Sequence, residues 1–212
     1  MPMTAPNVHK FFEKLREENP HPKSDLEYTN TFTLLVAVVL SAQATDAGVN
    51  KATKDLFKIA DTPQKMQDLG LEKLKTYIKT IGLYNTKAEN VIKLSEKLIN
   101  EHESQVPDTR DALTALPGVG RKTANVVLNV AFGQPTMAVD THIFRVANRT
   151  GLAPGKTPEA VEKALVKTVP EEFALHAHHW LILLGRYRCK ARKPECSGCP
   201  VYDFCRFDQK TF

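Results

Sequence analysis

The chain has 212 residues, a formal net charge of +5, and 42% hydrophobic and 25% charged residues. This composition excludes a disordered or collagen-like chain, and the longest apolar run, residues 34–40, is far shorter than the roughly 18 residues that span a bilayer. The N-terminus shows no apolar segment typical of a secretory signal, so we expect an intracellular, reducing compartment and no disulfide framework.

Helical patterns follow one another along the chain. Apolar residues recur at helical spacing in residues 11–15, and residues 31–42 are apolar on nearly all sides, which predicts a central buried helix. Residues 45–59 are amphipathic. Residues 86–99 carry an apolar stripe and follow Asn85, which we expect to cap that helix.

The remaining elements are also predicted to be helical. Thr62 and Thr157 each precede a proline, a pattern typical of helix starts, and residues 171–187 form a further helical segment. Only residues 136–139 are ambiguous between strand and loop. The sequence therefore predicts an all-α fold of about ten helices, and its composition marks no domain border.

A glycine-containing turn carries the most informative pattern. Residues 111–116 and 122–132 are predicted helices, and Pro117-Gly118-Val119-Gly120 separates them. Glycines permit unusual backbone angles and close approach, and the N–H groups at the start of the second helix suit a phosphodiester. An ordinary turn between packed helices is the alternative; the Arg121-Lys122 pair that follows favours a helix-hairpin-helix that binds the DNA backbone.

Lys122 lies in the first turn of the second helix. The helix dipole and the neighbouring Arg121 both disfavour its ammonium form. A neutral amine can attack a sugar carbon and form a Schiff base. On the residues alone, a nucleophile and a simple phosphate contact are equally good interpretations.

Asp140 follows two apolar residues and precedes a predicted helix. The residues alone favour an N-cap, which stabilises a helix by about 1 kcal/mol. The alternative is a carboxylate that stabilises positive charge on a sugar ring while a glycosidic bond breaks. Nothing in the spacing places Asp140 beside Lys122.

All four cysteines lie in the last 24 residues with the spacing C-x6-C-x2-C-x5-C. Four thiolates so close in sequence can surround one metal centre, and both zinc and an iron–sulfur cluster accept four cysteines. The spacing leaves that choice open. The four cysteines are Cys189, Cys196, Cys199 and Cys205.

The segment around these cysteines is basic. Residues 185–212 contain seven Lys or Arg and three Asp or Glu, so this loop would offer positive charge to phosphates.

Together these motifs resemble the bacterial endonuclease III family of helix-hairpin-helix DNA glycosylases. The likeness rests on LPGVGRKTANVVLN at 116–129, AVDTHIFRVANRTG at 138–151 and the cysteine spacing, and it extends to SAQATD at 41–46 and IGLYN at 81–85. It implies a base-excision-repair enzyme that removes oxidised pyrimidines of the thymine glycol type and cleaves abasic sites by β-elimination. It also implies a [4Fe–4S] cluster on the four cysteines.

The resemblance further implies an organisation into two helical domains with a cleft between them. A six-helix domain with the hairpin would cover residues 23–134. A discontinuous domain would join residues 1–22 to 135–212 and carry the cluster loop at 189–205.

Site roles follow residue by residue from the resemblance. Lys122 would be the nucleophile and Asp140 its carboxylate partner, while Gln43 and Leu83 would enter the duplex where a nucleotide is flipped out. Core packing for Leu83 and a helix-end cap for Gln43 are the alternatives. Asp46 and His142 would line the lesion pocket. The DNA backbone would be held by Gly118, Val119, Gly120, Arg121, Lys190, Arg192 and Lys193.

The expected partner is double-stranded DNA with damaged pyrimidines or abasic sites, bound by a monomeric cytoplasmic bacterial protein associated with the nucleoid and not with a membrane. Three alternatives stay open on the sequence: a non-catalytic DNA-binding module, a mismatch-specific glycosylase of the same superfamily, and a redox protein built around the cluster. A metal site formed by His176, His178 and His179 is disfavoured, because only the first and third share a helix face.

Overall fold

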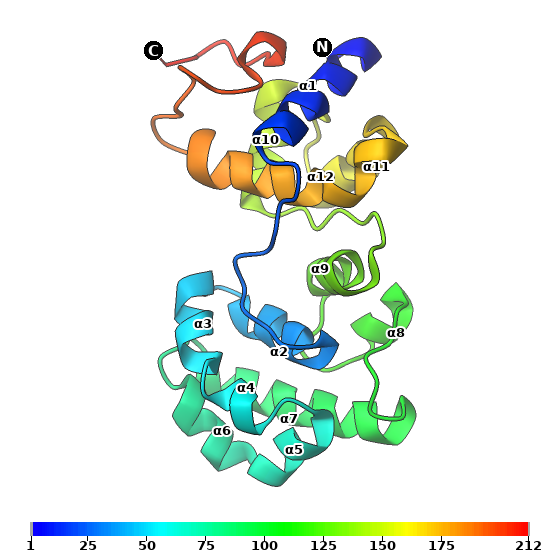
Figure 1. The fold of residues 1–212 in the computed structure, drawn as a ribbon, viewed down its shortest axis with the longest axis vertical. Coiled ribbons are helices and arrows are strands. Elements are labelled where there is room, and N and C mark those ends of the chain that lie inside the picture. Colours follow the sequence, from blue (N-terminus) through cyan, green and yellow to red (C-terminus); the bar gives the residue numbers. More distant parts are fainter. Residues whose placement is uncertain (1, 212) are drawn as a thin grey trace. The chain divides into compact units, whose positions relative to one another are not determined.

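The computed structural model describes residues 2–211, which form helices joined by loops with no strand in that range (Figure 1). The all-α expectation is confirmed, and residues 136–139 are not a strand. Backbone contacts divide the chain into two units. Residues 24–133 form a continuous unit, and residues 1–23 with 134–212 form a discontinuous unit.

The continuous unit is built around an apolar helix. Every residue of Phe32–Leu40 in this helix is buried, as its sequence predicts, and Asn30 caps it in a reciprocal pair with Thr33. The long helix α7 packs against α2, α5 and α6, and α9 packs against α2 and α8. The helices are α2 (Thr31–Ser41), α3 (Asp46–Thr53), α4 (Leu56–Ile59), α5 (Pro63–Leu69), α6 (Leu71–Ile78), α7 (Tyr84–Glu101), α8 (Arg110–Thr114) and α9 (Arg121–Phe132).

The amphipathic residues 45–59 form two helices, α3 and α4, with a break at 54–55 where the backbone stays right-handed. One local prediction for this unit was wrong. The start of α7 is set by Leu83, whose φ is 59°, and Asn85 lies inside the helix. Eight helical segments, some of a single turn, lie in residues 24–133.

The discontinuous unit joins the N-terminal helix to the last third of the chain. Phe12 stacks on Phe173 with ring centroids 5.7 Å apart, and Phe173 meets Trp180 edge-on at 6.2 Å. This aromatic core holds α1 against α12. The elements are α1 (Ala5–Glu18), α10 (Thr141–Thr150), α11 (Pro158–Thr168), α12 (Glu171–Leu183), a π-helical turn (Leu184–Arg188) and a 3₁₀ turn (Tyr202–Phe204).

The helix predicted over 171–187 thus ends at Leu183 and continues as a π-helical turn, in which the Cys189 N–H donates to the Leu184 carbonyl at 2.7 Å. None of the helices in the described part of the chain is both long and apolar enough to cross a membrane.

Candidate functional site

The glycine turn between α8 and α9 is a tight hairpin. The Val119 N–H donates to the Leu116 carbonyl at 3.1 Å, and both side chains are buried. Gly118 has a φ of +77°, and a Cβ there would lie 2.9 Å from the Asn90 side chain, so the fold requires glycine. A Cβ on Gly120 would meet nothing within 4 Å. Gly120 therefore leaves the surface open to close approach by another molecule.

Lys122 is the second residue of α9 and is exposed. Gly120 occupies the N-cap position and forms no side-chain cap, so the start of α9 keeps the character of an anion site. Below the surface, Arg110 Nε donates to Asn125 Oδ1 at 2.9 Å and joins α8 to α9. The hairpin is held from within by this bond.

Gln43 and Leu83 share an unusual conformation. Gln43 has a φ of 55° and Leu83 a φ of 59°, and both are exposed. The Leu83 side chain is 64% exposed, which excludes core packing as its role. The left-handed backbone of Leu83 is unfavourable for a residue with a side chain, and the exposure of an apolar side chain to water is unfavourable as well. Both features therefore indicate selection for something other than stability.

Asp140 caps α10, as the residues alone predict. Its Oδ1 accepts hydrogen bonds from the N–H groups of His142 and Ile143, both at 2.9 Å. Upstream, the buried His178 accepts the Ala138 N–H at its Nδ1, at 3.3 Å. The segment that carries the carboxylate is therefore fixed from two sides. His178 acts here as a hydrogen-bond acceptor.

Arg145 links α10 to the loop that follows the π-helical turn. Its Nε donates to the Cys189 carbonyl at 2.9 Å, and its Nη2 donates to the Gly185 carbonyl at 2.8 Å and lies 3.2 Å from His142 Nδ1. Gly185 makes this contact possible, because a Cβ there would lie 2.8 Å from the His142 Cβ. Sequence reasoning missed Arg145 and Gly185, since neither belongs to a local motif.

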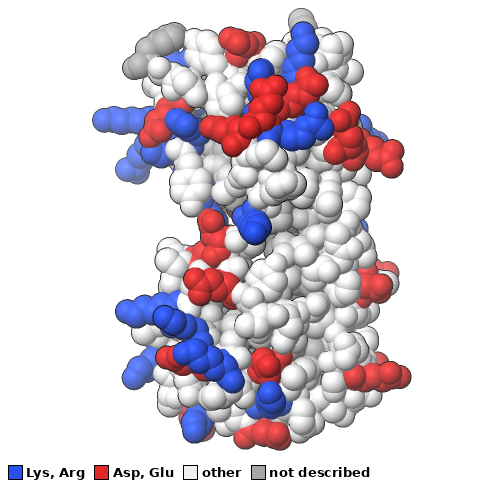
Figure 2. Space-filling model, in the orientation of Figure 1, with Lys and Arg blue, Asp and Glu red and all other residues white. Residues whose placement is uncertain are grey.

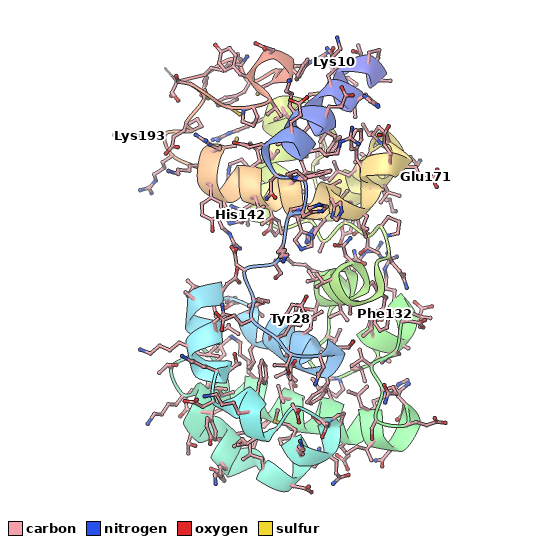
Figure 3. All side chains as sticks on the ribbon, viewed as in Figure 1. Lys10, Tyr28, Phe132, His142, Glu171 and Lys193 are labelled. Carbon is pink, nitrogen blue, oxygen red and sulfur yellow. The ribbon has the colours of Figure 1, made fainter. Side chains whose placement is uncertain are left out.

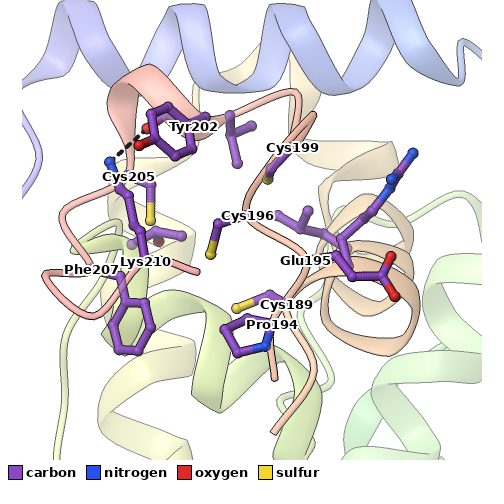
Figure 4. Close-up of a pocket in the computed structure, with 13 residues that line it drawn as sticks. Cys189, Pro194, Glu195, Cys196, Cys199, Tyr202, Cys205, Phe207 and Lys210 are labelled. Atoms are coloured by element: carbon purple, nitrogen blue, oxygen red, sulfur yellow. Dashed lines mark hydrogen bonds between the residues drawn. The ribbon is translucent and has the colours of Figure 1, made fainter. Parts of the chain in front are cut away.

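The four cysteines line one pocket at the C-terminal end of the chain (Figure 4). Their sulfur atoms lie around one space, and Lys210 and Tyr202, which also line the pocket, are joined by a hydrogen bond of 3.0 Å from Lys210 Nζ to the Tyr202 carbonyl. No group of three or more His, Cys, Asp or Glu side chains in residues 2–211 is arranged to hold a metal ion. A single zinc ion would need each sulfur within about 2.3 Å, whereas a cluster of several atoms spreads its four thiolates around a larger space.

The donor set fits such a cluster. All four potential ligands are thiols, and each is half-buried. Burial raises the pKa of the Cys199 and Cys205 thiols, so cluster binding must release protons from them. Arg149 lies alongside, with Nη1 3.7 Å from Cys189 Sγ and hydrogen-bonded to the Lys190 carbonyl at 2.7 Å.

The loop between the first two cysteines is basic and exposed. In the upper part of Figure 2, Lys and Arg side chains lie at the surface with Asp and Glu side chains among them, and Figure 3 shows Lys193 projecting from the loop. Lys193 has a φ of 51°, and Arg192 is also exposed. Lys190 forms an ion pair with Glu195, which lowers the pKa of that carboxyl group. Lys190 therefore offers less charge to a phosphate than its neighbours.

The two units divide the candidate residues between them. The continuous unit carries Gln43, Asp46, Leu83, the hairpin and Lys122. Asp46 is the first residue of α3 and is half-buried. The discontinuous unit carries Asp140, His142, the basic loop and the cysteines.

Comparison with known proteins decides the family. Residues 36–171 match the HhH-GPD superfamily of base excision DNA repair proteins, and residues 189–205 match the iron-sulfur binding domain of endonuclease III. The chain is 62% identical to endonuclease III of Haemophilus influenzae and 61% identical to that of Escherichia coli K12, over 93% of each chain. The chain belongs to the endonuclease III family.

A solved structure of a trapped endonuclease III–DNA covalent intermediate, an estranged-adenine complex, has a TM-score of 0.89 to this chain. It is 46% identical and covers 96% of both chains. Membership of the endonuclease III family makes the chain a base-excision-repair DNA glycosylase with abasic-site lyase activity, whose partner is DNA. The iron–sulfur match settles the metal question that the spacing left open in favour of a [4Fe–4S] cluster.

Proposed function

We propose that this enzyme removes oxidised pyrimidines from duplex DNA and then cleaves the strand, with Lys122 as nucleophile and Asp140 as the carboxylate. The observation that carries the proposal is the placement of an exposed primary amine in the first turn of α9, directly after an open glycine hairpin suited to a phosphate. A covalent intermediate with DNA in a relative is what a nucleophilic mechanism requires.

The first step exchanges one bond at the sugar for another. The Lys122 nitrogen forms a bond to C1′, and the glycosidic C1′–N bond breaks, its electron pair leaving with the base, which takes up a proton. Positive charge develops on the sugar while that bond breaks, and a carboxylate such as Asp140 stabilises it. The bound amine then loses a proton, the C1′–O4′ bond breaks as O4′ takes up a proton, and the nitrogen lone pair forms the C1′=N bond of a protonated Schiff base between Lys122 and C1′.

The second step breaks the strand. The Schiff base makes the C2′ proton acidic, and its removal expels the 3′ phosphate from C3′ by β-elimination. Water then hydrolyses the imine and returns the free lysine. The same lysine nitrogen displaces the base and forms the Schiff base, so base removal and strand cleavage both depend on Lys122.

Extrusion of the damaged nucleotide precedes this chemistry, and it is easiest for bases that stack poorly. Gln43 and Leu83 would occupy the space that the nucleotide leaves. Their exposure and their left-handed backbone support this role, because both features are costly without a partner. Asp46 and His142 would contact the flipped base.

The remaining surfaces would hold the DNA backbone. The hairpin residues Gly118, Val119, Gly120 and Arg121 would bind a phosphate through backbone N–H groups. Arg192 and Lys193 would contact phosphates from the cluster loop, with Lys190 contributing less because of Glu195. Cys189, Cys196, Cys199 and Cys205 would ligate the cluster, which orders this loop. We expect a monomer that works in the cytoplasm on nucleoid DNA.

Borohydride trapping tests the assignment. The enzyme is incubated with a duplex that contains one thymine glycol, and reduction should convert the Schiff base into a stable adduct that maps to Lys122 by peptide mass. Lys122→Gln should bind the duplex and give no adduct. An adduct formed equally well by that variant would refute the assignment, and a protein that binds but never nicks abasic DNA would be a DNA-binding module only.

A further inference from the structure

A buried lysine in the continuous unit has no part in the chemistry above. Lys87 lies on α7 and is only 6% exposed. It lies on the same buried face of α7 as Val91 and Leu94, where an apolar residue is expected. Burial lowers the pKa of its ammonium group, and a buried cation is costly unless its protons are bonded. A fold that keeps this group has a specific use for it.

The partner of Lys87 is the end of α2. Its Nζ donates to the Leu40 carbonyl at 2.9 Å. The last carbonyls of a helix have no partner within the helix, and their dipoles favour a cation. The neighbouring carbonyls of Val38, Val39 and Ser41 are satisfied locally, by Ser41 Oγ and by the N–H groups of Ala42 and Ala44. The bond from Lys87 ties this helix end to another helix.

Lys87 also bonds the start of its own helix. Its backbone N–H donates to the Leu83 carbonyl at 3.0 Å. Leu83 is exposed and in left-handed backbone, and so is Gln43, which lies three residues after Leu40. One residue therefore bonds both segments from which the proposed intercalating side chains project. Because Leu40 and Lys87 lie 47 residues apart in the sequence, no local sequence pattern predicts this bond.

We propose that Lys87 is a positioning residue that fixes the backbone of Gln43 relative to that of Leu83. This inference rests on the proposed function, in which both side chains enter the duplex. A residue in left-handed backbone keeps that conformation only where its surroundings determine it. Without the Lys87 bond the end of α2 loses its anchor, and the turn that carries Gln43 relaxes away from the geometry needed to fill the duplex.

The test compares Lys87→Met with Lys93→Met, an exposed lysine on the same helix. Base removal is measured on a duplex with one thymine glycol, and unstacking is followed by 2-aminopurine placed opposite an abasic analogue. Strand cleavage of an abasic single strand, which needs no extrusion, is measured in parallel. Lys87→Met should lower base removal by about tenfold to a hundredfold and weaken the 2-aminopurine signal, while single-strand cleavage stays unchanged. Lys93→Met should match the wild type in all three.

A double-mutant cycle shows whether Lys87 acts through Gln43. If it does, Lys87→Met should change base removal much less in a Gln43→Ala background than in the wild type. Should Lys87→Met not fold, Lys87→Gln, whose shorter amide does not reach Leu40, carries the same expectations.

Three results would overturn the proposal. A Lys87→Met enzyme that behaves like Lys93→Met refutes it, and so does a loss of both activities in proportion to the melting temperature. If Gln43→Ala and Leu83→Ala are themselves silent, the intercalating roles in the proposed function fail and the positioning role fails with them. If those two variants are impaired and Lys87→Met is not, only the inference about Lys87 fails.

Discussion

Arg145 Nε donates a hydrogen bond to the backbone carbonyl of Cys189 at a distance of 2.9 Å. Arg145 lies on α10, the helix that Asp140 caps, and Cys189 is the first cysteine of the cluster loop. Within the discontinuous unit, the carboxylate-bearing helix and the cluster loop are therefore joined by one side chain. Damage to the loop should reach α10 through this bond.

Replacing Arg145 with Ala should destabilise the discontinuous unit. The Cys189 and Gly185 carbonyls each lose a charged donor, which should cost about 3 kcal/mol in total. We expect a lower melting temperature and a smaller ratio of visible to ultraviolet absorbance, since a loosened loop retains less cluster. Lys193→Ala, on the exposed part of the same loop, is the control. Equal cluster content in both variants would contradict the prediction.

Gly185→Ala should be destabilising by about 1–3 kcal/mol, because its Cβ would lie 2.8 Å from the His142 Cβ and 3.0 Å from the His142 carbonyl oxygen. At this chain length that corresponds to a drop of several degrees in melting temperature. Gly82→Ala is a matched control, since a Cβ there would meet nothing within 4 Å. A Gly185→Ala protein that melts with the wild type would show that the π-helical turn can move away from α10.

The two hairpin glycines should separate folding from binding. Gly118→Ala introduces a side chain at a φ of +77° and against Asn90, so it should lower the melting temperature. Gly120→Ala has open space and a φ of −91°, so it should lower stability much less than Gly118→Ala, by no more than the loss of a glycine N-cap. Its methyl group stands where a phosphate would approach, and the Kd for an abasic-analogue duplex should rise. Unchanged affinity for Gly120→Ala would remove the hairpin from the DNA-binding surface.

Asp140→Asn should separate the cap from the carboxylate. Asn is as good an N-cap as Asp, so the bonds to the His142 and Ile143 N–H groups should persist and the melting temperature should hold. Without the negative charge, base removal should be lost while duplex binding is kept. Asp140→Ala should lose base removal and about 1 kcal/mol of stability. Normal turnover by Asp140→Asn would leave Asp140 with a purely structural role.

The sequence by itself determined what depends on neighbours in the chain. The apolar run of α2 has to be buried, the Asp140 carboxylate reaches N–H groups two and three residues ahead, and four closely spaced cysteines share a pocket. A φ of +77° at Gly118 follows equally from a tight turn. These features rest on helix periodicity, capping and short loops, which local sequence specifies.

Only the tertiary structure decided which distant groups meet. Lys87 bonds the carbonyl of Leu40, which lies 47 positions away in the sequence. The hydrogen bond from Arg145 to Cys189 spans 44 positions. The left-handed backbone of Leu83 likewise replaced the helix start that Asn85 suggested. Such features are set by the packing of one helix on another, and a chain reveals them only when its segments are brought together in three dimensions.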